Sequence, residues 1–168
     1  MNLLFYRYGS ICEPDIIESF QELGFHVDTI EDEIYDKSIS GKEQISLLNQ
    51  HLQQDNYQFV FTINFFPAIS EVCNLYHLPY LSLIVDSPVM ELYSDSIANP
   101  WNRIFLFDKV LYEEFSPYNP ECIFHLPLAT NVARWDSVIS SSANKLQDFL
   151  STVSFIGSLY SEKCPYYD

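Results

Sequence analysis

The sequence predicts an α/β fold of the Rossmann-like, doubly wound kind, with a mainly parallel sheet and helices on both faces. The strongest indication comes from two short runs without charge, 58–63 and 80–85. Such runs are typical of strands buried on both faces of a parallel sheet. A helical pattern over 67–76 joins them into a βαβ unit. Because parallel strands end at a common edge, where open α/β sheets bind ligands, the turns 64–67 and 86–88 are expected to lie side by side there.

The first thirty residues predict the same unit, with strands at 3–6 and 25–30. Pro14 fits the first position of the intervening helix, and Gly24 fits its C-terminal cap. The apolar face expected to point inward consists of Ile16, Ile17, Phe20 and Leu23.

An acidic run, 31–33, follows the second strand. It is interpreted as a solvated loop; the alternative is a ribose contact, as in dinucleotide-binding folds, although the glycine-rich fingerprint of those folds is missing. A helix is predicted over 43–54. Its buried side chains are expected to be Ile45, Leu48 and Leu52.

The remaining elements follow from the same patterns. The helix at 67–76 is expected to bury Ile69, Val72 and Cys73. Ser87 and Pro88 are read as the cap and first residue of a short helix, 89–93, and Asp108 as the cap of a helix at 109–115. Further strands are predicted at 103–107 and 122–125.

The C-terminal part predicts a change of domain. Residues 1–132 form the Rossmann-like domain, and 133–152 form a linker or surface helix interrupted by serines at 140–142. A strand at 153–156, followed by a glycine turn, is expected to open a second domain, of which 153–168 is only the start.

Composition excludes several classes of function. Asp and Glu number 23 against eight Lys and Arg, a formal charge of −15, which disfavours nucleic acid and anionic membranes as partners. No apolar run is long enough to span a bilayer, and no signal peptide precedes the first strand, so a cytoplasmic location is expected. The four cysteines form no CxxC pair, which favours reduced thiols over a zinc site.

Five segments together resemble a known family. They are Phe5-Tyr6-Arg7-Tyr8-Gly9-Ser10, Phe61-Thr62-Ile63-Asn64-Phe65-Phe66-Pro67, Ile84-Val85-Asp86-Ser87-Pro88, Leu106-Phe107-Asp108 and His125-Leu126-Pro127-Leu128-Ala129-Thr130-Asn131. The pattern resembles the N-terminal, DUF3880-type domain of bacterial CgeB-like glycosyltransferases. The stretch 155–160 looks like the start of the C-terminal domain of that family.

The resemblance implies the N-terminal half of a GT-B architecture, in which two Rossmann-like domains face a cleft. It implies an acceptor-side domain, with the nucleotide-sugar donor bound mainly by the missing C-terminal domain, through a turn that includes Gly157 and Ser158. No metal and no other cofactor is expected. The partners implied are a nucleotide sugar, an unidentified acceptor and the C-terminal domain, and the fragment alone is expected to be inactive.

Each candidate residue has a functional and a structural interpretation. Asp86 could act as a general base for an acceptor hydroxyl or could cap the next helix, and His125 could be an acid or base or a hydrogen-bonded strand residue. Asn64, Phe65 and Phe66 could bind and stack on a sugar or form a turn. Gly9, Ser10 and Ser87 lie in loops and could bind the substrate, and the alternative for them is a plain turn or a helix cap. Asn131 could also bind the substrate and would mark the hinge between the domains.

Two other functions fit the pattern. A non-catalytic Rossmann-like module that binds a ligand or protein keeps the fold without the chemistry. A receiver-like phosphoacceptor domain is disfavoured, because it needs an acidic pair after the first strand and an Asp after the third. The sequence has Arg7-Tyr8-Gly9 and Asn64 at those places.

Overall fold

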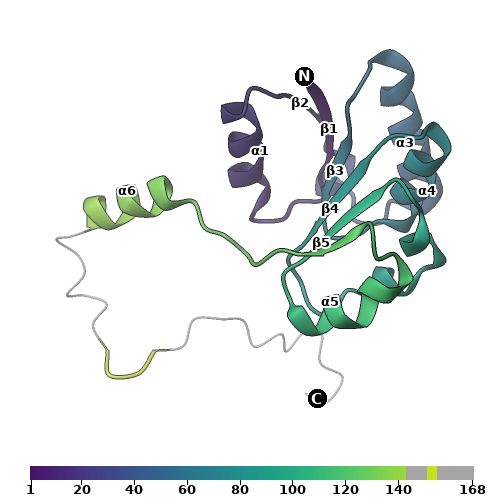
Figure 1. Cartoon of the computed structure of the whole chain (residues 1–168). Coiled ribbons are helices and arrows are strands. Elements are labelled where there is room, and N and C mark those ends of the chain that lie inside the picture. Colours follow the sequence, from purple (N-terminus) through teal and green to yellow (C-terminus); the bar gives the residue numbers. More distant parts are fainter. Residues whose placement is uncertain (143–150, 155–168) are drawn as a thin grey trace, which may run out of the picture. The chain divides into compact units, whose positions relative to one another are not determined.

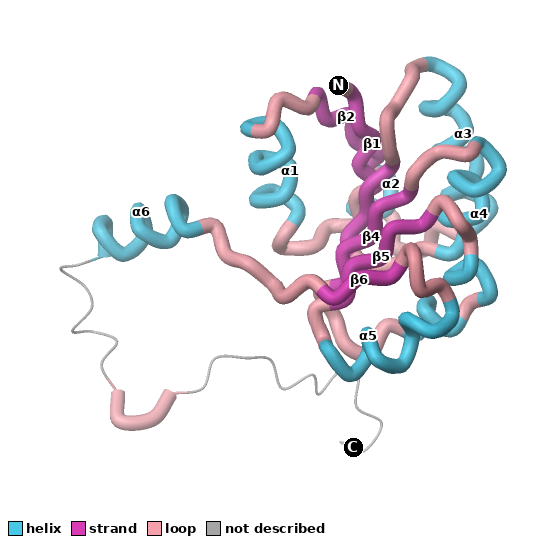
Figure 2. The backbone as a smooth tube through the Cα atoms, in the orientation of Figure 1, coloured by secondary structure: helices cyan, strands magenta, loops and turns pink. Residues whose placement is uncertain are grey.

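The computed structural model describes residues 1–142 and 151–154 and divides the chain into two units, 1–129 and 130–168. A parallel sheet of six strands forms the centre of the first unit (Figure 2). The strands are β1 (Asn2–Tyr6), β2 (His26–Ile30), β3 (Val60–Ile63), β4 (Tyr80–Ile84), β5 (Asn102–Leu106) and β6 (Ile123–His125). Their order is β2-β1-β3-β4-β5-β6, which confirms the predicted α/β fold.

Helices cover the two faces of this sheet unequally (Figure 1). One face packs against α3 (Gly41–Gln54), α4 (Pro67–Tyr76) and α5 (Lys109–Phe115) and contains most of the buried core. On the other face, α1 (Glu13–Glu22) packs on the first strands through Phe20, whose ring lies 5.1 Å from that of Phe61.

The second half of that other face carries partly exposed apolar side chains. Phe105 of β5 and Phe124 of β6 stack with ring centroids 5.4 Å apart, and Phe124 keeps 37% of its surface exposed. Leu81 and Leu83 of β4 are also only partly buried. Buried and half-buried residues alternate along β4 and β5, because helices cover one face of the sheet there more completely than the other.

The connections contain several short helical segments. They are α2 (Asp32–Tyr35) and the 3-10 segments η1 (Met90–Tyr93), η2 (Asp95–Ala98) and η3 (Ser116–Tyr118). The second unit contains α6 (Val132–Ser142), and Asn131 accepts a hydrogen bond from the backbone N–H of Arg134 at its start. The serines at 140–142, where an interruption was predicted, are the last residues of α6, and residues 143–150, which follow, lie outside the described part of the chain.

Four expectations are wrong. Ser87 does not cap a helix, because the Ser87–Pro88 peptide is cis and the next helical segment begins only at Met90. Leu23 follows α1 and is 71% exposed, and Ile45 lies on the outer side of α3. Residues 153 and 154 are described and are not in a strand.

Candidate functional site

Asn64 connects the ends of β3 and β4 at the carboxyl edge of the sheet. Its φ of 58° lies in the left-handed region, which Asn adopts more readily than most residues. Its side-chain nitrogen donates to the Asp86 carboxylate at 2.6 Å and to the Tyr8 hydroxyl at 2.9 Å. Its side-chain oxygen accepts from the Val85 N–H at 3.1 Å. The predicted adjacency of the two turns is confirmed.

A buried hydroxyl holds the loop that carries Asn64. Tyr80 of β4 has no exposed surface, and its hydroxyl accepts the Phe66 N–H at 2.9 Å. The same hydroxyl donates to Thr62 at 2.7 Å, since the Thr62 hydroxyl itself donates to the Asn64 carbonyl at 2.6 Å. Burial raises the pKa of Tyr80, so the phenol stays protonated and the chain of hydrogen bonds is neutral.

We expect Tyr80→Phe to lower the free energy of unfolding by about 1–3 kcal/mol, because it leaves the buried Phe66 N–H without an acceptor. Urea denaturation measures the change. The matched control is Tyr118→Phe, whose exposed ring leads to an expected change within about 0.5 kcal/mol. Equal stability of the two variants would show that the hydroxyl does not hold the loop.

Glu13 occupies the loop that follows β1. The side chain is completely buried, and one carboxylate oxygen accepts from the N–H groups of Tyr8, Gly9 and Ser10 at 3.0, 2.8 and 3.0 Å. The other oxygen accepts from the Arg7 guanidinium at 2.9 Å. Converging N–H groups at the start of a helix are an anion-binding arrangement in α/β proteins. Here the chain's own carboxylate is the anion.

Arg7 completes this arrangement through a second partner. Its guanidinium also pairs with the carboxylate of Glu31, which directly follows β2. The acidic run is not a plain solvated loop, because Asp32 and Glu33 begin α2 and both Glu31 and Glu33 are half-buried with partners elsewhere in the chain, whereas Asp32 is exposed as predicted. The three backbone donors and two N–H groups of the arginine therefore already bind carboxylates of the chain itself.

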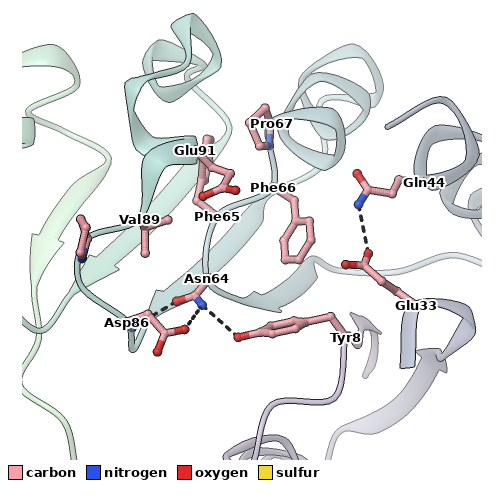
Figure 3. A pocket seen from close by; sticks show the side chains of 11 residues that line it. Tyr8, Glu33, Gln44, Asn64, Phe65, Phe66, Pro67, Asp86, Val89 and Glu91 are labelled. Carbon is pink, nitrogen blue, oxygen red and sulfur yellow. Dashed lines mark hydrogen bonds between the residues drawn. The ribbon is translucent and has the colours of Figure 1, made fainter. Parts of the chain in front are cut away.

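A pocket of about 480 Å³ lies beside the ends of β1, β3 and β4 (Figure 3). Its size is in the range of small-molecule sites, on the order of 300–1,000 Å³. The strand order changes direction between β1 and β3, and open α/β sheets bind ligands at such a point. The residues that line it are Tyr8, Glu33, Gln44, Asn64, Phe65, Phe66, Pro67, Asp86, Pro88, Val89 and Glu91.

The walls of this pocket combine aromatic rings with fixed polar groups. The rings of Tyr8 and Phe66 lie 5.7 Å apart, and Figure 3 shows them between Asn64 and Glu33. Glu33 accepts from the Tyr6 hydroxyl at 2.5 Å and from the Gln44 amide at 3.0 Å. Burial, followed by the bond to Glu33, raises the pKa of Tyr6, so this phenol remains a donor.

Tyr8 is also neutral at physiological pH. Burial is the largest cause of its raised pKa, and the nearby charges of Asp86 and Glu13 add to it. Its hydroxyl accepts from the Asn64 amide, which places the phenol at the edge of the sheet where β1 and β3 end. The pocket therefore offers neutral hydroxyl and amide groups together with carboxylates.

The structure brings some of the predicted site residues together and leaves others apart. Asn64, Phe65, Phe66 and Asp86 all line the pocket, although Phe65 is almost completely buried. Asp86 is exposed and accepts from Asn64, and the predicted capping role is wrong because no helix begins at Pro88.

The other predicted site residues do not line the pocket. Gly9 and Ser10 bind Glu13, and Ser87 donates to Asp108 at 3.4 Å. His125 is exposed at the end of β6, where its Nε2 lies 3.2 Å from the Phe107 carbonyl. Asn131 lies in the second unit. Gly157 and Ser158 lie outside the described residues.

Three polar residues of the pocket were missed in the sequence. Glu33 belongs to the acidic run interpreted as solvated, and Gln44 and Glu91 carry no local signal that distinguishes them from surface positions. Tyr8 could have been found, since it lies two residues after β1, at the edge where ligands bind.

Comparison with known proteins supplies no relative for this chain: no family model matches it, and no curated protein matches it. Within the described residues, none of the helices is both long and apolar enough to cross a membrane. The function is therefore inferred from the pocket itself.

Proposed function

We propose that this domain binds a polyhydroxylated acceptor in the pocket beside Asn64 and serves as the acceptor side of a glycosyltransferase. The observation that carries the proposal is the distribution of anion-binding groups. The loop after β1 is filled by Glu13, and among the described residues no Lys or Arg lines the pocket. A diphosphate lacks binding groups here, whereas hydroxyl groups can donate to carboxylates and pack on aromatic rings.

Asp86 is the residue assigned to the proton of the acceptor hydroxyl. Its carboxylate is exposed at the pocket, and the Asn64 amide fixes it through a bond of 2.6 Å to one oxygen. In the transfer, the carboxylate takes the hydroxyl proton while the hydroxyl oxygen forms the new bond to the sugar carbon and the nucleoside diphosphate leaves. His125 has no role in this proposal, because it does not line the pocket.

The proposal is tested by titrating the chain with a panel of mono- and disaccharides, with UDP and inorganic phosphate in parallel, and following backbone amide shifts by NMR. We expect saccharides to shift the amides of residues 64–66, 86, 87 and 89–91, and UDP and phosphate to leave them unchanged. Shifts produced by UDP alone would contradict an acceptor site. Because the fragment alone is expected to be inactive, transfer is measured with the full-length gene product, where saccharide binding without transfer from any nucleotide sugar would instead favour a non-catalytic binding module.

Asp86→Asn separates binding from folding. We expect about a tenfold loss of saccharide affinity, because a hydrogen bond to a charged acceptor contributes about 1.5–3 kcal/mol. The fold is retained, since an Asn side chain can still accept the Asn64 amide hydrogen. Asp95→Asn is the control, because it removes the same charge from an exposed position that does not line the pocket. Equal losses in both variants would contradict a local role for Asp86.

A further inference from the structure

We infer that the ligand of this pocket carries a positively charged amine in addition to its hydroxyl groups. This inference rests on the proposed function and deepens it, because it names the class of acceptor. Three of the lining residues are acidic, namely Glu33, Asp86 and Glu91, and none is Lys or Arg. Figure 3 shows the three side chains distributed around the pocket, from α2, the turn after β4 and η1.

The protein leaves these charges uncompensated. Glu33 accepts from the Tyr6 hydroxyl and the Gln44 amide, and Asp86 accepts from the Asn64 amide, so every recorded side-chain donor is neutral. Neutral donors satisfy lone pairs but leave the net negative charge. The Glu91 backbone carbonyl accepts from the Ser94 N–H, but in the part of the chain that the structure describes its carboxylate has no hydrogen bond or ion pair.

Two basic side chains bind at the loop after β1 and do not line the pocket. Arg7 binds Glu13 and Glu31, and Lys37 donates to the backbone carbonyl of Tyr8, with its ammonium 5.7 Å from the centroid of the Tyr8 ring. Because carboxylates that line a concave site focus a negative potential, a cationic ligand is concentrated there and an anionic ligand is repelled. The net charge of the chain acts in the same direction.

The aromatic wall fits the same ligand. Tyr8 and Phe66 lie next to each other in the pocket, with their rings inclined by 55°. The faces of aromatic rings attract an ammonium group and also pack on the C–H faces of a sugar. The Lys37 ammonium already lies over the Tyr8 ring, so the Phe66 ring and the three carboxylates are the groups that suit an amino sugar or an aminocyclitol better than a neutral sugar.

A comparison of glucosamine, N-acetylglucosamine and glucose tests the inference, since the three differ mainly in the group at one carbon. Binding is measured by NMR titration at low and at high salt. We expect glucosamine to bind at least tenfold more tightly than the other two at low salt, with the advantage shrinking as salt screens the carboxylates. Equal affinities would overturn the inference and leave the saccharide pocket standing.

Variants and a non-sugar amine separate the remaining outcomes. Glu91→Gln is expected to remove most of the glucosamine advantage, whereas the control Glu121→Gln, exposed and outside the pocket, keeps it. An advantage that persists in Glu91→Gln and Asp86→Asn would overturn the inference. If putrescine binds as tightly as glucosamine and glucose does not bind, the charge assignment stands and the proposed function fails. If none of the ligands binds, both fail.

Discussion

Glu13→Gln is expected to lower the free energy of unfolding by about 3–5 kcal/mol, the usual effect of removing one member of a buried ion pair. The substitution removes the charge of a side chain that has no exposed surface and leaves Arg7 with only one of its two carboxylate partners, Glu31. It also weakens three hydrogen bonds from the backbone of the loop, because a carboxylate is a stronger acceptor than an amide. Urea denaturation of both proteins at pH 7 measures the difference.

Glu22→Gln provides the control for this prediction. It removes the same charge from the same helix, but its side chain is exposed, so the expected change is within about 0.5 kcal/mol. A second measurement distinguishes local from global effects. Amide exchange is expected to rise most strongly at Tyr8, Gly9 and Ser10 in Glu13→Gln. If these amides exchange as in the unsubstituted protein, Glu13 does not hold the loop.

Asn64→Asp is expected to cost about 2–4 kcal/mol at neutral pH. The change replaces the amide that donates to Asp86 at 2.6 Å with a second carboxylate, so an attraction becomes a repulsion at close range. The bond from the same amide to the Tyr8 hydroxyl is lost as well. Thermal or urea unfolding compares the variant with Asn56→Asp, which adds an identical charge at an exposed position.

The pH dependence of Asn64→Asp follows from the same contact. In the folded variant, the Asp86 charge raises the pKa of the new carboxyl above its unfolded value, so the folded state binds a proton more tightly than the unfolded state. The destabilisation relative to the unsubstituted protein is therefore smallest below about pH 3.5 and grows as pH rises through the raised pKa. A difference that is constant with pH would contradict the charge mechanism.

Local patterns predicted most of the fold because each element depends on nearby residues. The helix at Pro67–Tyr76 has the predicted bounds, since Pro67 begins it and His77, with a φ of 53°, ends it. β3 and β4 lie where the two uncharged runs predict them. Ser87 and Pro88 show the limit of this reasoning, because a Ser-Pro pair occurs both at helix starts and in turns, and only the surrounding structure selects between them.

The site was predicted where it depends on sheet geometry and missed where it depends on distant partners. Parallel pairing alone places Asn64 next to Asp86. In contrast, Glu33 belongs to the pocket because Tyr6 and Gln44, far away in the sequence, orient it. The importance of Glu13 was also missed, since a glutamate at the start of a helix is common at the surface and its burial arises only when the loop folds over it.

The N–H groups of Tyr8, Gly9 and Ser10 bind the Glu13 carboxylate, which stabilises the domain, and are therefore not free to bind a nucleotide phosphate. The three N–H groups that hold this carboxylate have the arrangement that other α/β proteins use to hold a phosphate. A chain with a short side chain at position 13 would free these donors for a ligand and would lose the internal contact that now orders them. In evolutionary terms, an exchange between an acceptor-binding and a phosphate-binding form of this fold therefore requires compensating stability from elsewhere in the molecule.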